Sequence, residues 1–297
     1  MTTSYSSTHV VQITDTTDEN ACLKIRSAYA KHLGLNGIRD AFVDVTPATN
    51  TLSIGVKASE LVHNSERPDR LLLALNCAPP DKEEGTTDNA RNDFFMADLG
   101  DGVFTGGTIN GLELSYLKGR IKELFRLTST NSLGSQFRSL QILPEHLVRF
   151  SVPEQREALI SSGTFARIEN IDDIVRDIPD CSHVVEVDNF DNVKFFPSRQ
   201  DRDFLSSNDF ATFHFGHESI EFSTTPPKIN RTFNALVRPT LFNAPLGENV
   251  IARNSSSKVS GDTVPMIATV RERPAETPAG YDVPHVGRPV YLLEFAA

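Results

Sequence analysis

The chain has 297 residues and a formal net charge of −10, with 39% hydrophobic and 23% charged residues. This composition is typical of a soluble globular protein, and no apolar run approaches the roughly 20 residues of a membrane-spanning helix. The acidic balance argues against a nucleic-acid binder, because phosphate binding requires a basic face. The length allows one large domain or two moderate ones.

The cysteines and the N-terminus indicate a compartment and exclude some kinds of site. Cys22, Cys77 and Cys181 are widely spaced and form no CxxC pair, which argues against a disulfide framework or a structural zinc site. The opening MTTSYSSTHV lacks the basic start and the apolar core of a signal peptide. We therefore expect a cytoplasmic protein with a small-molecule ligand, no membrane partner and no metal.

Strand and helix patterns alternate along the first half of the chain. Short apolar runs predict strands at residues 9–13, 41–45 and 71–76. Helical spacing of apolar residues predicts helices over 24–34 and 113–127, and glycines within 94–107 predict a hairpin. The continuous apolar run of the third strand suits a parallel strand covered on both faces. We predict an α/β domain over residues 1–176, with a largely parallel sheet and flanking helices.

The second half of the chain has a different composition. Short strand-like pieces such as ATFHF, SIEFS, NVIAR and PVYLLEF are separated by proline and glycine, without a helical pattern between them. This change predicts a separate all-β domain, a small barrel or a sandwich, over residues 177–297.

Three segments of the first half carry polar groups at positions suited to chemistry. In ITDTTDEN (13–20), Asp15 is placed to grip a ribose diol at the end of a parallel strand, or the polar cluster is a helix N-cap formed by Thr or Asp. The prolines of NCAPPDKEEGTTDNARND (76–93) predict a shaped loop, in which Asp81 and Arg91 are catalytic groups or solvated charges. In GSQFRSLQILPEHLV (134–148), His146 is a catalytic group or a structural hydrogen-bonding residue.

Two segments of the second half interrupt strand patterns with polar residues. HVVEVDNFDNVKFF (183–196) breaks at DNFDN, where two carboxylates and two amides surround one aromatic ring. Asp and Asn tolerate left-handed backbone, so this break is a tight turn or one wall of a ligand pocket. GENVIARNSSSK (247–258) ends a strand with a turn at residues 253–255, whose main chain can read the edge of a base.

The order of these segments resembles one known family. ITD near the start, a shaped loop after a buried strand, an NG turn, a GSxFR segment, VDNFDN and IARNSS occur in that order. They resemble the S-adenosylmethionine (SAM) hydroxide adenosyltransferases, or SAM hydrolases, a family that includes the SAM-dependent fluorinases and chlorinases. The resemblance covers nearly the whole chain and is best in IARNSSS and VDNFDN. It implies an α/β domain, a C-terminal β-barrel, and a homotrimer with each site built between subunits.

Carried over by position, the resemblance implies a pocket for a nucleoside and an amino acid, with SAM as substrate or ligand and no separate cofactor. Asp15 falls at the ribose-binding aspartate and Asn20 at a second acidic position near the methionine. Asp188 falls at the residue that meets the methionine ammonium. The positions that hold adenine, comprising two rings, an amide and a turn, fall on Phe190, Phe233, Asn192, Arg253, Asn254 and Ser255.

The positions that would activate a nucleophile depart from the family pattern. Ala78 stands where the hydrolases have an aspartate, and Gln136 stands where they have a histidine. An attacking water must lose a proton, so hydrolysis would need Arg91, Asp81 or His146 to replace the missing groups. The resemblance therefore implies transfer of the 5′-adenosyl group of SAM to hydroxide or a related nucleophile, or binding of SAM or adenosine without turnover.

Overall fold

The chain divides into two compact units, Met1–Asp177 and Ile178–Ala297, each with its own sheet. The division lies one residue after the predicted domain boundary. The computed structural model describes residues 7–16, 18–48, 50–64, 70–77, 94–108, 111–128, 138–187, 191–215, 233–239, 248–253, 258–259, 262–269, 288 and 290–293.

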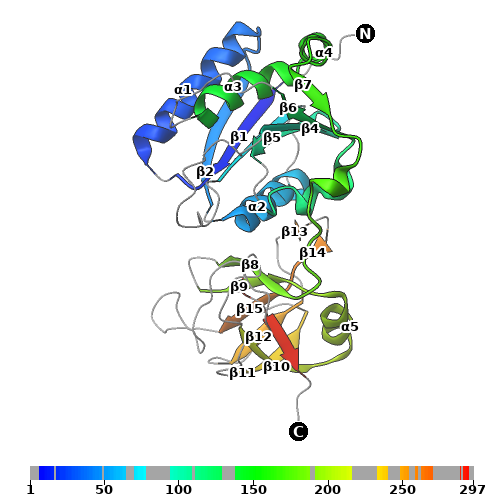
Figure 1. Ribbon diagram of the computed structural model, residues 1–297. Helices are drawn as coiled ribbons and strands as arrows, with labels where there is room; N and C mark the ends of the chain where they lie inside the picture. Colours follow the sequence, from blue (N-terminus) through cyan, green and yellow to red (C-terminus); the bar gives the residue numbers. More distant parts are fainter. Residues whose placement is uncertain are drawn as a thin grey trace, which may run out of the picture. The chain divides into compact units, whose positions relative to one another are not determined.

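The described residues of unit 1 form one seven-stranded sheet, sheet A, in the order β2-β1-β3-β5-β4-β6-β7 (Figure 1). The pairs β1–β2, β1–β3 and β3–β5 are parallel, and the pairs that involve β4, β6 and β7 are antiparallel. The strands are β1 (Thr8–Thr14), β2 (Ala41–Pro47), β3 (Arg70–Asn76), β4 (Phe94–Gly100), β5 (Val103–Thr108), β6 (Glu123–Leu127) and β7 (Phe165–Arg167).

Helices cover both faces of sheet A (Figure 1). They are α1 (Glu19–Leu35), α2 (Thr51–Asn64), α3 (Arg138–Phe150) and α4 (Pro153–Ser161), with short 3-10 helices η2 (Ser115–Arg120) and η3 (Ile171–Asp173). Adjacent residues of β1 point to opposite faces, so Val10 packs with Tyr29 of α1 and Leu143 of α3 in one core. Val11 packs with Ile54 of α2 in the other core. An α/β unit with flanking helices is thus confirmed, and its sheet is mixed.

The predicted helix over 113–127 is wrong in its second half. Residues Ser115–Arg120 form η2, and Glu123–Leu127 form β6. The apolar positions satisfy helical spacing, but Leu124 and Phe125 are consecutive and belong to the two opposite cores, which is the alternation of a strand. The predicted strands, the helix at 24–34 and the hairpin of β4 and β5 are confirmed.

The described residues of unit 2 form a second seven-stranded sheet, sheet B, in the order β16-β10-β11-β12-β15-β9-β8, and a small β13–β14 pair. In sheet B, β11 and β12 are parallel and the other paired strands are antiparallel. The strands of unit 2 are β8 (His183–Val187), β9 (Val193–Phe196), β10 (Phe210–Phe215), β11 (Phe233–Arg238), β12 (Asn249–Ala252), β13 (Lys258–Val259), β14 (Asp262–Thr263), β15 (Met266–Thr269) and β16 (Val290–Leu293).

Two features of unit 2 bear on the prediction of an all-β barrel or sandwich. The helix α5 (Arg199–Ser207) stands between β9 and β10, with Ser198 as its N-cap. The expectation that no helix intervenes is therefore wrong. Each outer strand of sheet B also donates a backbone hydrogen bond to a residue that precedes the other, from Val184 N of β8 to Arg288 O (2.8 Å) and from Val290 N of β16 to Ser182 O (2.7 Å).

The first residue of β8 is a fully buried histidine. His183 has no exposed surface, its Nδ1–H donates to the Cys181 carbonyl (2.8 Å), and its ring lies 5.8 Å from that of Phe196. Burial lowers the pKa of His183 to about 4, because an imidazolium at this position would lose its hydration. The hydrogen bond to Cys181 acts in the opposite direction and offsets only part of this effect.

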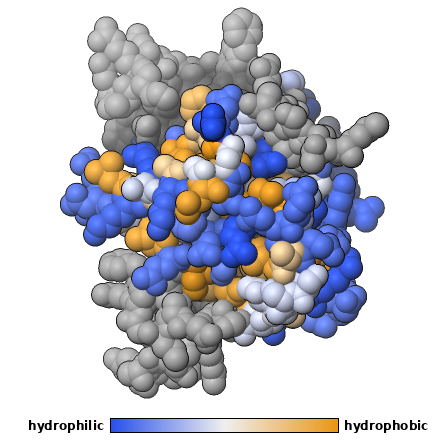
Figure 2. Space-filling view, turned by 90° about the horizontal axis from the view of Figure 1, so that it is seen from above, coloured by the Kyte–Doolittle hydropathy of each residue, from blue (hydrophilic) through white to orange (hydrophobic). Residues whose placement is uncertain are grey.

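The expectation of no membrane partner concerns the helices and the surface of the described residues. No helix among these residues is long and apolar enough to cross a membrane. In the view of Figure 2, hydrophobic residues lie in small groups separated by hydrophilic ones. The large hydrophobic side chains that stand exposed are Leu23, Leu35, Phe42 and Phe210.

Candidate functional site

The carboxyl edge of sheet A has the topology that marks ligand sites in open α/β sheets. β2 and β3 flank β1 on opposite sides, and α1 and α2, which make the two connections, pack on opposite faces. The strand order therefore reverses at β1. Such a reversal leaves a crevice outside the carboxyl ends of the strands, where small molecules bind. We call the ends of β1 and β3, residues 14–16 and 76–77, the switch point.

A hydrogen-bond network joins the two strands at the switch point. The hydroxyl of Thr14 donates to Asp15 Oδ1 (3.4 Å) and accepts from Asn76 Nδ2 (3.3 Å) and from the Thr16 N–H (3.4 Å). The backbone N–H of Asp15 donates to the Asn76 carbonyl (3.4 Å). Thr14 is fully buried, whereas Asp15 is exposed. The network therefore ties a solvent-facing aspartate to the ends of two neighbouring strands.

The start of α1 confirms the alternative interpretation of segment 13–20, a helix N-cap formed by Thr or Asp. Asp18 is the N-cap of α1, and its Oδ1 accepts from the backbone N–H of Ala21 (2.7 Å). Asn20 follows in the first turn of α1 and is exposed. The capping residue is thus Asp18 and not Asp15, and Asn20 lies at the same edge of sheet A.

The structure does not bring His146 to this edge. His146 lies on α3 with its ring edge-on to Phe165 of β7 (5.6 Å between ring centres), and its Nδ1 is buried without a hydrogen-bond partner. Burial lowers the pKa of His146, and the imidazole of His32 lies close enough to lower it further. His32 is near the end of α1, which rises about 1.5 Å per residue, so this histidine pair lies about 20 Å from the start of α1 beside Asp15.

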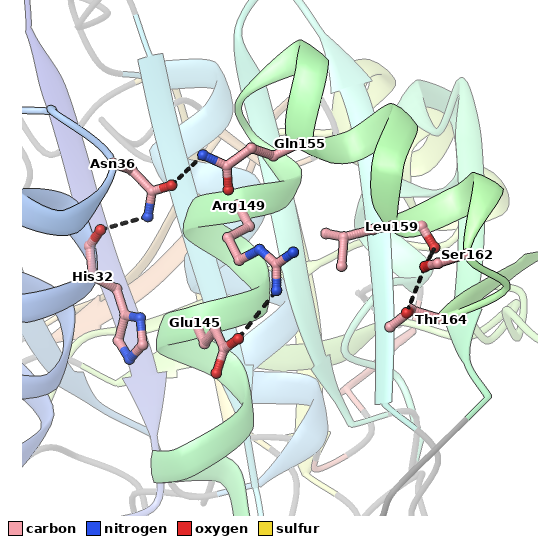
Figure 3. Close-up of polar contacts among 8 residues, drawn as sticks. All are labelled: His32, Asn36, Glu145, Arg149, Gln155, Leu159, Ser162 and Thr164. Carbon is pink, nitrogen blue, oxygen red and sulfur yellow. Dashed lines mark hydrogen bonds and ion pairs between the residues drawn. The ribbon is translucent and has the colours of Figure 1, made fainter.

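The surroundings of His146 are those of a helix–helix contact. Figure 3 shows Glu145 and Arg149 of α3 joined by an ion pair (3.1 Å) beside His32 of α1. In the same contact, Gln155 of α4 hydrogen-bonds to Asn36 at the end of α1. We therefore assign His146 a packing role at this helix–helix contact, which is far from Asp15.

In unit 2, the break in the strand pattern at 188–192 is a connection between β8 and β9. These strands pair antiparallel, and Asp191 has a φ of 60°, a left-handed conformation that Asp tolerates better than most residues. Asn192 follows, half-buried, directly before β9. The left-handed backbone of Asp191 agrees with the tight-turn interpretation, and the pocket-wall interpretation stays a prediction. Asp188 and Phe190 lie outside the described residues.

The predicted adenine-holding residues of sheet B that are described lie at different levels along the strands. Phe233 begins β11 and stacks on Phe213 (5.5 Å, 25° between planes), so one face of its ring is covered by the core. Arg253 follows β12 and lies level with residue 239 of β11, six residues beyond Phe233. At about 3.3 Å per residue, this places Arg253 about 20 Å from Phe233 along the strands. Asn192 lies level with residue 236 of β11, midway between Phe233 and Arg253 along the strands.

Two groups of Arg253 donate hydrogen bonds inside unit 2. Its backbone N–H donates to the Arg238 carbonyl (2.8 Å), and its Nη2 donates to the Asn208 carbonyl (2.8 Å) at the end of α5. The N–H that was expected to read a base is therefore engaged within sheet B. Asn254 and Ser255, the other members of the predicted turn, lie outside the described residues.

The remaining predicted catalytic residues also lie outside the described residues. They are Asp81 and Arg91, and the departures from the family pattern at Ala78 and Gln136 lie outside as well. The sequence did not single out Thr14 and Asn76 as members of the site. The signal available for Asn76 was its position, because a polar residue directly follows the buried apolar run of residues 71–75.

Other features of the described residues do not add a second site. No group of three or more His, Cys, Asp or Glu side chains in the described ranges is arranged to hold a metal ion, and all three cysteines are free. A surface hollow beside β7 is lined by Arg126 and by residues 166–170 and 173–174. It lies five strands away from β1, about 24 Å across sheet A, and is separate from the switch point.

Comparison with known proteins shows the fold. No protein-family model and no curated protein matches this chain. An uncharacterized conserved protein from Thermotoga maritima is similar, with 13% identity, a TM-score of 0.61, and coverage of 96% of this chain and 100% of that one. A conserved hypothetical protein from Thermus thermophilus has 16% identity, a TM-score of 0.54, and coverage of 96% and 99%. These likenesses show a shared fold over nearly the whole chain.

Proposed function

We propose that this protein binds SAM and transfers its 5′-adenosyl group to hydroxide. The observation that carries the proposal is the position of Asp15, an exposed aspartate that does not cap α1 and that stands where the strand order of sheet A reverses. A carboxylate there can accept hydrogen bonds from both hydroxyls of a ribose. The resemblance to the SAM hydrolases supplies the identity of the nucleoside.

The proposed reaction is a displacement at the ribose C5′ carbon. The oxygen of water forms a bond to C5′, and the bond from C5′ to the sulfonium sulfur breaks, with its electron pair left on sulfur. One proton is released, so SAM and water give adenosine, methionine and a proton. The sulfonium cation and the attacking hydroxide neutralise each other in the transition state. The main tasks of the protein are therefore to align the two and to remove the other water molecules that surround the hydroxide.

A second candidate function is binding of SAM or adenosine without turnover. The position of His146 favours it, because one of three candidate activating residues lies far from Asp15. Ala78 and Gln136 favour it too, since they stand where hydrolases of this family carry activating groups. Under the first candidate function, Asp81 or Arg91 must supply the activation that the attacking water requires.

The resemblance also supports proposals on assembly. We propose that sheet B is a closed barrel, for which the hydrogen bonds between the β8 and β16 segments are the support. We propose a cytoplasmic homotrimer in which the α/β unit of one subunit and the barrel of the next share a ligand. Light scattering coupled to gel filtration tests the trimer, and a mass of one subunit, about 33 kDa for this chain, would exclude it.

The experiment is incubation of the purified protein with SAM, with adenosine and methionine measured by liquid chromatography and SAM binding measured by calorimetry. Asp15→Asn keeps the size of the side chain but removes its charge, so we expect binding to weaken about 10- to 100-fold, as for loss of hydrogen bonds to a charged group. The matched control is Asp101→Asn, because Asp101 is an exposed residue of the β4–β5 turn, and its φ of 52° is one that Asn adopts readily.

The outcomes separate the candidates. Equal amounts of adenosine and methionine, lost in Asp15→Asn and retained in Asp101→Asn, support hydrolysis. Saturable binding of SAM without either product supports the binding protein. Absence of heat with both SAM and adenosine, from protein that is folded by circular dichroism, refutes the proposed function in both forms.

A further inference from the structure

Thr14 sits at the centre of the network at the switch point, and its hydroxyl has a defined donor direction. A hydroxyl carries one proton and can accept two hydrogen bonds. Two donors, Asn76 Nδ2 and the Thr16 N–H, point at the Thr14 oxygen. The hydroxyl proton is thereby directed to Asp15 Oδ1. The three bonds fit one arrangement of donors and acceptors, without conflict.

The location of Thr14 makes this arrangement rigid. The residue is fully buried at the last position of β1, and its register partner in β3 is Asn76. A β-branched side chain in a strand has few accessible χ1 rotamers, so the position of the hydroxyl oxygen is restricted. Asn76 comes from a strand 62 residues further along the chain, and its carbonyl also accepts the Asp15 N–H. The aspartate is thus held through its backbone by Asn76 and through its side chain by Thr14.

We infer that Thr14 and Asn76 are positioning residues for Asp15 and that they set the selectivity of this site for a nucleoside with a free ribose diol. The inference rests on the proposed function. A carboxylate that must accept two hydrogen bonds from adjacent hydroxyls needs a fixed plane, and a misplaced carboxylate forms one of them at most. Thr14 donates to Oδ1, which orients that plane before the ligand arrives.

The test compares adenosine with 2′,3′-dideoxyadenosine by calorimetry. The wild-type protein should bind adenosine about tenfold or more tightly than the dideoxy compound, because only adenosine offers hydroxyls to Asp15. In Thr14→Val, a change that keeps the shape and removes the hydroxyl, this ratio should fall toward one through loss of adenosine affinity. The affinity for 2′,3′-dideoxyadenosine should stay unchanged, and Thr14→Ser, which keeps a hydroxyl, should restore the ratio.

Asn76→Ala provides an independent test, because it leaves Thr14 in place and removes one donor to its oxygen. It should lower the adenosine preference in the same direction as Thr14→Val, and it keeps the inference testable if Thr14→Val does not fold. An equal fall in affinity for both nucleosides would show that Thr14 and Asn76 act only on the fold, and an unchanged ratio in folded variants would also overturn the inference. Binding of SAM without binding of adenosine by the wild-type protein would overturn the inference alone, whereas failure to bind SAM and both nucleosides would refute the proposed function, and the inference with it.

Discussion

The buried imidazole of His183 predicts that unit 2 loses stability as the pH falls. The pKa of His183 is about 4 in the folded protein against 6.5 in the unfolded chain, so the unfolded chain binds more protons between these values. The stabilising effect is fully present above pH 6.5 and is lost as the pH falls toward 4. With these two pKa values, proton binding by His183 lowers the free energy of unfolding by about 2 kcal/mol when the pH falls from 7 to 5.

The matched variant is His183→Asn, because an Asn side chain keeps an N–H that can reach the Cys181 carbonyl and does not titrate in this range. It should begin with a lower stability, since a smaller side chain leaves part of the space beside Phe196 unfilled. Its stability should then fall by about 2 kcal/mol less than that of the wild-type protein between pH 7 and pH 5.

Hydrogen exchange followed by mass spectrometry suits this measurement, because peptides from β8 and β9 report on unit 2 separately from unit 1. That separation is needed since burial also lowers the pKa of His32 and His146 in unit 1. Protection is compared after correction for the intrinsic pH dependence of exchange. Parallel pH profiles for the wild-type protein and His183→Asn would refute the reasoning, because they would show that His183 does not couple proton binding to folding.

Two further predictions concern packing in unit 1 and are checked by urea unfolding. Gly107→Ala should destabilise the protein by about 1–3 kcal/mol, because the added Cβ would lie 2.0 Å from the Leu75 carbonyl oxygen. Gly34→Ala is the control and should be neutral or stabilising, because its added Cβ meets nothing within 4 Å. Equal effects of the two variants would contradict this prediction. Arg156→Leu should cost about 3 kcal/mol, since Asp98, only 18% exposed and 2.6 Å from the guanidinium, would lose its cation. The double variant with Asp98→Asn should recover part of that loss, and strict additivity would argue against a coupled pair.

Local patterns in the sequence determined much of unit 1. The segment 71–76 is apolar up to its last residue, so it predicted a buried central strand without knowledge of its neighbours, and β3 lies between β1 and β5. The segment 113–127 was predicted wrongly, because the spacing of its apolar residues is compatible with a helix and, in part, with a strand. Packing on both faces of sheet A selected the strand for its second half.

The composition of the candidate site depended on contacts between distant residues. The sequence identified Asp15 from its place after a strand, but the network with Asn76 exists only because β1 and β3 become neighbours. His146 and Arg253 were chosen by residue type, and packing assigned them to a helix contact and to a strand end. Residue type and local spacing determine which groups can do chemistry and which segments form strands. Register and strand order decide which of those groups meet, because hydrogen bonds and close packing act between residues that the chain itself keeps far apart.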